Sequence, residues 1–147
     1  MSQFGHDANM DTPELSVVVI SYNTRDLTLA CLSSVYAETQ TPFELIVVDN
    51  NSTDGSPEAI SAQFPQATLI AESTNHGFAR AHDIALPHAS APWLLLLNPD
   101  TIVLDGALDK LLAYAKTTPD AGIWGGRTLY ADRSLNPTSC WGKMTPF

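Results

Sequence analysis

An acidic residue follows the most apolar run in the chain, in the stretch Asn98-Pro99-Asp100-Thr101 after the four leucines at 94–97. Proline has no N–H and cannot continue a strand ladder, so Pro99 would end strand pairing at a fixed place. Asp100 would then hold its carboxylate beyond the sheet edge, where Mg²⁺ or Mn²⁺ could bind, since both take oxygen ligands. The same residues also suit a tight turn, and on spacing alone the turn is the better interpretation.

Polar groups follow three other apolar runs as well. Asp49 ends one run, where it could accept a hydrogen bond from a nucleobase N–H or, equally well, form an Asx turn in a loop rich in Asn and Ser. Tyr22 offers a flat face for stacking a base, or packs at a strand end. Gly77 can take positive φ before a helix whose N-terminus could face an anion, although most helix starts bind nothing. The sequence contains no dinucleotide, P-loop, zinc-protease or serine-hydrolase motif.

The elements that must position these groups alternate between strands and helices. Short runs rich in Val, Ile and Leu predict strands over 15–21, 44–49, 67–71 and 93–98. Helical spacing, with N-cap and proline signals, predicts helices over 26–39, 56–64, 78–86 and 105–118. This order predicts an α/β fold with a mainly parallel sheet, whose ligands bind at the carboxyl ends of the strands. The leucine run is interpreted as a strand buried on both faces.

Composition and charge exclude several classes of protein. The 147 residues suit one domain, and no run of about 18 apolar residues predicts a membrane span. A net charge of −9 with seven Lys and Arg leaves no basic face for nucleic acid, so a phosphate ligand would need a divalent cation. Cys31, on an apolar helical stripe, is expected to be a small core residue. Cys31 and Cys140 lack metal-site spacing, which favours a reducing compartment.

Four stretches in order resemble the inverting glycosyltransferases of family 2: residues 15–35, 44–56, 75–86 and 93–103. The Asn-Pro-Asp form, followed by residues 125–135, is most similar to the rhamnosyltransferase-like branch. The resemblance implies a GT-A fold, a Rossmann-like αβα sandwich that is truncated here. Residues 1–14 are expected to be a flexible leader, 15–135 the nucleotide-sugar-binding domain, and 136–147 the start of an acceptor-side region.

The resemblance also implies roles for single residues. Tyr22 and Asp49 match the residues that hold the nucleobase. Asp100 matches the second acid of the family's D-x-D motif, which binds a metal on the sugar-nucleotide diphosphate, so Mg²⁺ or Mn²⁺ is the expected cofactor. Asn98 stands where many members have the first aspartate, and it can still hydrogen-bond a ribose.

Family members often carry an Arg-Asn pair in the helix after Gly77. This chain has His82 and Asp83 there, and Arg80 is the candidate to replace the arginine. The full set expected to bind the nucleotide sugar is Ser21, Tyr22, Asn23, Asp49, Asn51, Asn75, Gly77, Arg80, His82 and Asn98.

The implied activity is transfer of a sugar, with rhamnose as a candidate, from a nucleotide diphosphate to an acceptor hydroxyl with inversion. The family's catalytic base is a carboxylate in the acceptor half, so we expect it beyond Phe147 and expect this chain to be the donor-binding part, inactive alone. A saccharide or lipid-linked acceptor, a homodimer and a cytoplasmic location at the inner membrane face are further expectations. The alternative is a non-catalytic nucleotide-binding or interaction module.

Overall fold

The structure is a computed structural model that describes residues 12–137. The expected leader and the expected acceptor-side region therefore lie mostly outside the described residues. The elements are β1 (Leu15–Ser21), α1 (Arg25–Glu38), β2 (Phe43–Asp49), α2 (Ser56–Gln63), β3 (Thr68–Ala71), α3 (Phe78–Ala85), the short 3₁₀ helix η1 (Leu86–His88), β4 (Trp93–Leu97) and α4 (Ala107–Thr117). Each predicted strand and helix is present, with ends that differ by no more than two residues.

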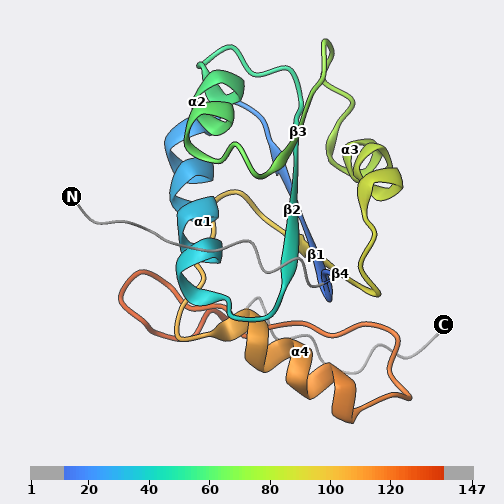
Figure 1. The fold of residues 1–147 in the computed structure, drawn as a ribbon. Coiled ribbons are helices and arrows are strands. Elements are labelled where there is room, and N and C mark those ends of the chain that lie inside the picture. The colour runs from blue at the N-terminus through green and yellow to red at the C-terminus, as the bar shows by residue number, and fades with distance from the viewer. Residues whose placement is uncertain (1–11, 138–147) are drawn as a thin grey trace, which may run out of the picture.

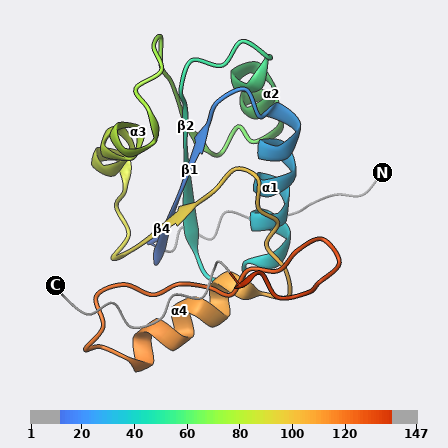
Figure 2. The same ribbon diagram turned by 180° about the vertical axis from the view of Figure 1, so that it is seen from behind.

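The four strands form one parallel sheet in the order β3-β2-β1-β4. Leu15 of β1 pairs with Phe43 of β2 and with Trp93 of β4, so these three strands start at one level. Helices α1 and α2 lie on one face of the sheet and α3 on the other, while α4 lies beyond the end where the strands begin (Figures 1 and 2). The predicted α/β fold with a parallel sheet is confirmed.

Alternating side chains of the strands build two apolar layers. On β1, Val17 and Val19 face α1 and α2, whereas Val18 and Ile20 pack with α3. Strands β1 and β2 are buried along almost their whole length. Because both faces are covered, these strands are continuous apolar runs rather than alternating ones.

Strand β4 does not follow this rule, so the prediction that it is buried on both faces is wrong. Leu94 is 44% exposed and Leu96 53% exposed, while Leu95 and Leu97 pack against the core. The reason is position in the sheet: β4 is at an edge, and α3 packs against β1 and β2. Val18, the neighbour of Leu96 on β1, is fully buried.

The Glu44 carboxylate fixes the start of β4, at the end of the sheet where the strands begin. Glu44 Oε1 accepts hydrogen bonds from Ser16 Oγ at 2.6 Å, Ser90 N at 2.6 Å and Ala91 N at 3.1 Å. Burial would raise the pKa of the Glu44 carboxyl, but these hydrogen bonds outweigh burial and leave the pKa below its usual range. Glu44 thus joins β1, β2 and the segment that leads into β4.

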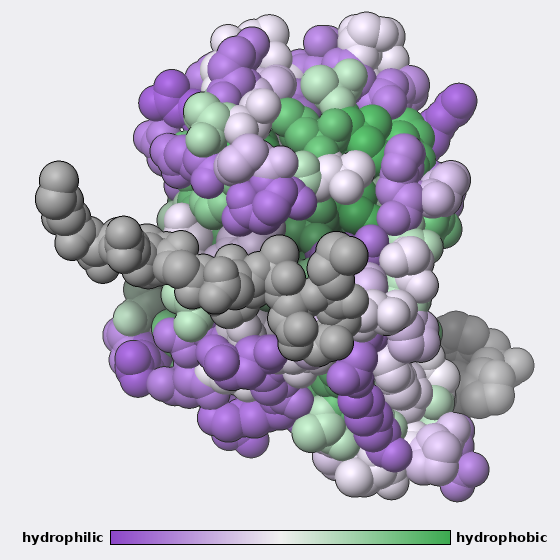
Figure 3. All heavy atoms as spheres, in the orientation of Figure 1, coloured by the Kyte–Doolittle hydropathy of each residue, from purple (hydrophilic) through white to green (hydrophobic). Residues whose placement is uncertain are grey.

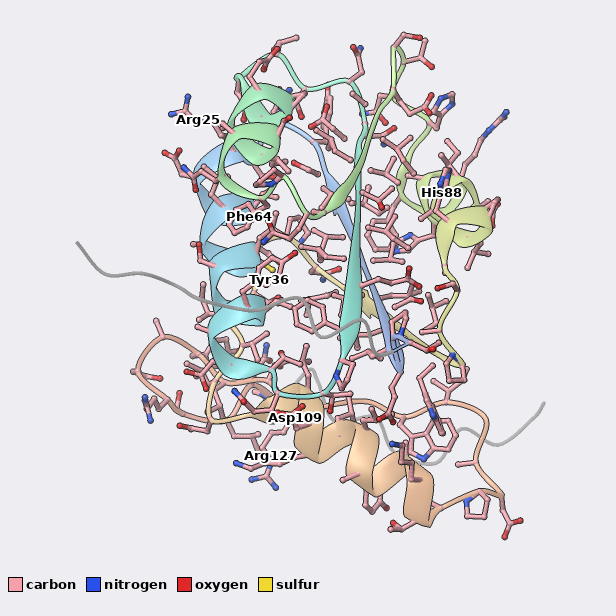
Figure 4. The ribbon with its side chains drawn as sticks, in the orientation of Figure 1. Arg25, Tyr36, Phe64, His88, Asp109 and Arg127 are labelled. Atoms are coloured by element: carbon pink, nitrogen blue, oxygen red, sulfur yellow. The ribbon has the colours of Figure 1, made fainter. Side chains whose placement is uncertain are left out.

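Helix α4 is attached to the same end of the molecule. Asp109 accepts the backbone N–H groups of Gln40 at 3.0 Å and Thr41 at 2.9 Å, and Glu38 accepts Gly106 N at 3.2 Å. Figure 4 shows Asp109 where α4 meets the turn after α1. Within residues 12–137, no helix is both long and apolar enough to cross a membrane.

Candidate functional site

Polar loops follow the strands at their carboxyl ends, opposite α4 (Figure 1). The backbone joins these loops directly: Asn50 N donates to Ser21 O at 2.8 Å, and Glu72 N donates to Asp49 O at 2.9 Å. We call these loops, residues 21–24, 49–55, 72–77 and 98–101, the rim. In Figure 3 apolar surface is visible between β3 and α3, below the polar loops. The rim is where parallel α/β sheets place their ligands.

Asp49 is a buried carboxylate with one oxygen unsatisfied. Its side chain is 1% exposed, and Oδ1 accepts Ser52 N at 2.8 Å, so the turn that the sequence allowed is present. Oδ2 has no hydrogen-bond partner among the described residues. Leaving a buried acceptor unpaired costs on the order of 1–3 kcal/mol, and natural proteins rarely keep such a group without a reason. Asp49 Oδ2 is therefore a buried acceptor left unsatisfied at the rim by the described residues.

Asn50 holds two rim loops together, a role that the sequence did not reveal. Its Nδ2 donates to Asn75 Oδ1 at 2.8 Å, and its Oδ1 accepts His76 N at 2.8 Å. Asn75 Oδ1 also accepts Gly77 N at 2.8 Å, and Gly77 has φ 77°, the positive value that was predicted. The available signal was the position of Asn50 directly after a buried strand.

Two predicted ligand residues are largely engaged by the protein itself. The Ser21 hydroxyl is buried and lies 3.1 Å from Thr28 Oγ1 of α1 and 3.5 Å from Thr24 Oγ1. Asn23 Oδ1 accepts Thr53 N at 2.8 Å, and Asn23 has φ 51°. Through these hydrogen bonds, the two side chains hold the rim loops in place.

Tyr22 and Asn51, in contrast, are open to solvent. The Tyr22 side chain is 48% exposed directly after β1, next to the strand that ends in Asp49. Asn51 is exposed with φ 70°, so the chain turns sharply between Asp49 and Ser52. An exposed ring beside a buried acceptor can stack a flat ligand whose edge carries an N–H.

The first turns of α3 carry the remaining candidates. Arg80 is exposed, whereas His82 is 9% exposed with Nδ1 2.8 Å from Phe78 O. Because a carbonyl only accepts, His82 Nδ1 carries a proton in this hydrogen bond. The Phe78 ring packs edge-on against His82 at 4.4 Å between centroids and is 60% exposed. Phe78 is an exposed aromatic near the rim that the sequence did not single out.

The stretch after β4 forms the turn that spacing alone favoured. Asn98 O accepts Thr101 N at 3.3 Å and Thr101 Oγ1 at 2.7 Å. Asp100 is exposed and makes no hydrogen bond to the described residues. No group of three or more His, Cys, Asp and Glu side chains able to hold a metal occurs within residues 12–137. Within the described part of the chain, Asp100 alone therefore offers too few oxygen ligands to complete the coordination of a cation.

A parallel sheet with polar loops at its carboxyl edge is the usual arrangement of a ligand-binding α/β domain. The chain belongs to glycosyl transferase family 2, whose family model matches residues 16–142. An N-acetylglucosaminyl-diphospho-decaprenol L-rhamnosyltransferase of Mycobacterium tuberculosis is 29% identical over 139 residues, which cover 87% of this chain and 45% of the relative. An O-antigen biosynthesis protein of Myxococcus xanthus is 31% identical, covering 92% of this chain and 11% of that protein.

A solved glycosyltransferase structure is also similar to this chain. The mannosyltransferase of Pyrobaculum calidifontis in complex with GDP-Man and Mn²⁺ has a TM-score of 0.64 and 30% sequence identity, covering 70% of this chain and 32% of that one. The chain thus spans less than half the length of the similar proteins reported above. The GT-A fold implied by the sequence is confirmed.

Proposed function

We propose that this chain is the donor-binding part of an inverting glycosyltransferase that transfers a sugar from a nucleotide diphosphate to an acceptor hydroxyl. Rhamnose is the candidate sugar, since the similar mycobacterial protein is named as a rhamnosyltransferase. The observation that carries the proposal is the buried, unpaired Asp49 Oδ2 at the carboxyl edge of the sheet. Family membership and the polar rim support the same reading.

In this proposal the rim binds the nucleotide through its base and its diphosphate. Asp49 Oδ2 accepts the N–H of the base, and Tyr22 stacks on the ring. The remaining donor-binding residues are Ser21, Asn23, Asn51, Asn75, Gly77, Arg80, His82 and Asn98. Ser21 and Asn23 act by fixing the rim, because their side chains bond within the protein.

Asp100 would hold Mg²⁺ or Mn²⁺ together with the diphosphate. Its free carboxylate and the absence of a wider cluster in residues 12–137 support a site completed by the nucleotide. A bound cation would neutralise charge on the leaving diphosphate. Asn98 is neutral, so the free cation alone should bind weakly.

The acceptor proposal is a saccharide or a lipid-linked saccharide of a cell-surface polysaccharide. It is supported by the decaprenol-linked acceptor in the name of the mycobacterial relative and by the O-antigen relative. A lipid-linked acceptor would place the enzyme in the cytoplasm at the inner face of the membrane. We assign residues 15–135 to donor binding and no described residue to the general base that would deprotonate the acceptor.

Isothermal titration calorimetry tests this function. UDP, dTDP, GDP and their sugars are titrated with and without Mn²⁺ into the wild type and into Asp100→Asn. The proposal expects tight binding of one base, enhanced by Mn²⁺ in the wild type and not in Asp100→Asn. No binding by any nucleotide would refute it. The second candidate, a non-catalytic nucleotide-binding module, is favoured by the isolation of Asp100; it predicts binding that Mn²⁺ does not enhance.

A further inference from the structure

A buried thiol supports the turn that carries Asp100. Cys31 Sγ of α1 lies 3.5 Å from Asn98 O and 3.8 Å from Thr101 Oγ1, and Cys31 is fully buried. Burial raises the pKa of the Cys31 thiol, and hydrogen bonds with Thr101 offset this only in part. Cys31 therefore keeps its proton and can donate it to Asn98 O.

A second side chain of α1, one turn further along, holds the far end of the same segment. Ser34 Oγ donates to Cys31 O at 2.7 Å and accepts Val103 N at 2.9 Å. Positions three apart on a helix share one face, so Cys31 and Ser34 form a single contact surface. Val103 in turn is buried in the core beside β1.

Apart from these contacts with α1, residues 99–103 form few hydrogen bonds to the other described residues. In the described part of the chain, their side-chain-mediated hydrogen bonds to another element go to Cys31 and Ser34. The remaining bonds are local, between Thr101 and Asn98. Side-chain hydrogen bonds from α1 therefore hold the Asp100 turn in place against the other rim loops.

We propose that Cys31 and Ser34 are positioning residues for the cation–diphosphate site: they set the place of Asp100 and thereby the extra affinity that a divalent cation gives to a bound nucleoside diphosphate. The inference rests on the proposed function and deepens it. Residues that orient a metal ligand typically change metal affinity by about 10–100-fold when they are replaced. Cys31 and Ser34 act through Asp100 and do not contact the ligand themselves.

The test compares the affinity for UDP and for dTDP with and without Mn²⁺, measured by calorimetry. The variants are Ser34→Ala and Cys31→Ala, with Cys31→Ser as a conservative variant that keeps a hydrogen-bond donor. Ser33→Ala is the matched control, because among the described residues Ser33 Oγ bonds only to Leu29 O of its own helix, at 2.8 Å. Circular dichroism reports whether each variant folds. If Cys31→Ala does not fold, the result for Ser34→Ala alone decides the test.

We expect the Mn²⁺ enhancement to fall about tenfold or more in Ser34→Ala and Cys31→Ala, with metal-free affinity unchanged. Cys31→Ser should retain most of the enhancement, and Ser33→Ala should match the wild type. An unchanged enhancement in both alanine variants overturns the inference. Equal losses with and without Mn²⁺ also overturn it, since they indicate a general loss of structure. If Mn²⁺ does not raise the nucleotide affinity of the wild type, the proposed cation site itself is contradicted, whatever the variants do.

Discussion

Asp49 and Asp100 are both carboxylates at the carboxyl edge of the sheet, yet their surroundings are opposite. Asp49 is buried with one oxygen bonded and one unpaired, whereas Asp100 is exposed and unbonded among the described residues. A buried single acceptor suits one directed hydrogen bond to a base. A free, exposed carboxylate can instead approach a hydrated cation. The two residues therefore suit two parts of one nucleotide.

Replacing Asp49 by Asn tests the first of these roles. Asn keeps an acceptor for Ser52 N but places an amide N–H₂ where Oδ2 was, so a base N–H would meet a donor. We expect nucleotide affinity to weaken by roughly 1–3 kcal/mol. Calorimetry with UDP and dTDP measures the change, and Asp120→Asn, on the exposed segment after α4, is the control. Equal affinity in a folded Asp49→Asn protein would rule out a base contact at Asp49.

Sequence reasoning identified these two residues from a local signal, because Asp49 directly follows an apolar run and Asp100 comes three residues after one. It left Asp49 open between a turn and a ligand contact, and the structure shows the turn on Oδ1 with Oδ2 still unpaired. Asn50 was not predicted, because its partners Asn75 and His76 lie 25 and 26 residues away in sequence. Such contacts depend on how loops meet in space.

At the scale of elements, the strands and helices were predictable and the exposure of β4 was not. β1 was predicted residue for residue, since its apolar run has clear limits. The exposure of Leu94 and Leu96 depends on the order of strands in the sheet, which no local pattern encodes. An apolar run predicts a strand but does not say which neighbours cover it.

The Glu44 contacts give a prediction for the pH dependence of stability. The Glu44 carboxyl has a folded pKa below its ordinary value of 4.5. Its stabilising contribution is therefore complete above about pH 4.5 and is lost as pH falls through the folded pKa. Glu44→Gln should lower the free energy of unfolding by about 1–2 kcal/mol at pH 7, because charged acceptors bind N–H and O–H donors more strongly than neutral ones.

Urea unfolding between pH 7 and pH 3 measures this difference. The gap between wild type and Glu44→Gln should close as Glu44 becomes protonated. Asp120→Asn, an exposed acid on the segment after α4, is the control and should have little effect at any pH. A gap that stays constant down to pH 3 would contradict the assigned role of Glu44.

At the scale of the whole molecule, β4 exposes leucine side chains at the edge of the sheet. One face exposes Leu94 and Leu96, and beside the strand a groove of about 560 Å³ runs between β4, α4 and residues 122–124. The described residues that line this groove include no charged side chain, although the chain carries a net charge of −9. Apolar patches of this kind favour association between proteins.

We expect the chain to self-associate through this surface and thereby to form the homodimer that was predicted from the sequence. Leu96→Lys places a charge on the patch and should lower the weight-average mass in sedimentation equilibrium. Leu27→Lys is a matched control, because Leu27 on α1 is also 53% exposed. A wild type that stays monomeric at high concentration would contradict self-association. Equal effects of the two substitutions would show that β4 is not the contact surface.

The central claim is that the rim binds a nucleoside diphosphate together with a cation held by Asp100. The most direct test is an ¹H–¹⁵N NMR titration with UDP and dTDP, followed by Mn²⁺ and, as a diamagnetic reference, Mg²⁺. The account predicts nucleotide-induced shifts at Asp49 and Ser52, and Mn²⁺ broadening strongest at Asp100 and Thr101 only when nucleotide is present. Broadening centred away from Asp100, or nucleotide shifts that leave Asp49 and Ser52 unmoved, would contradict it.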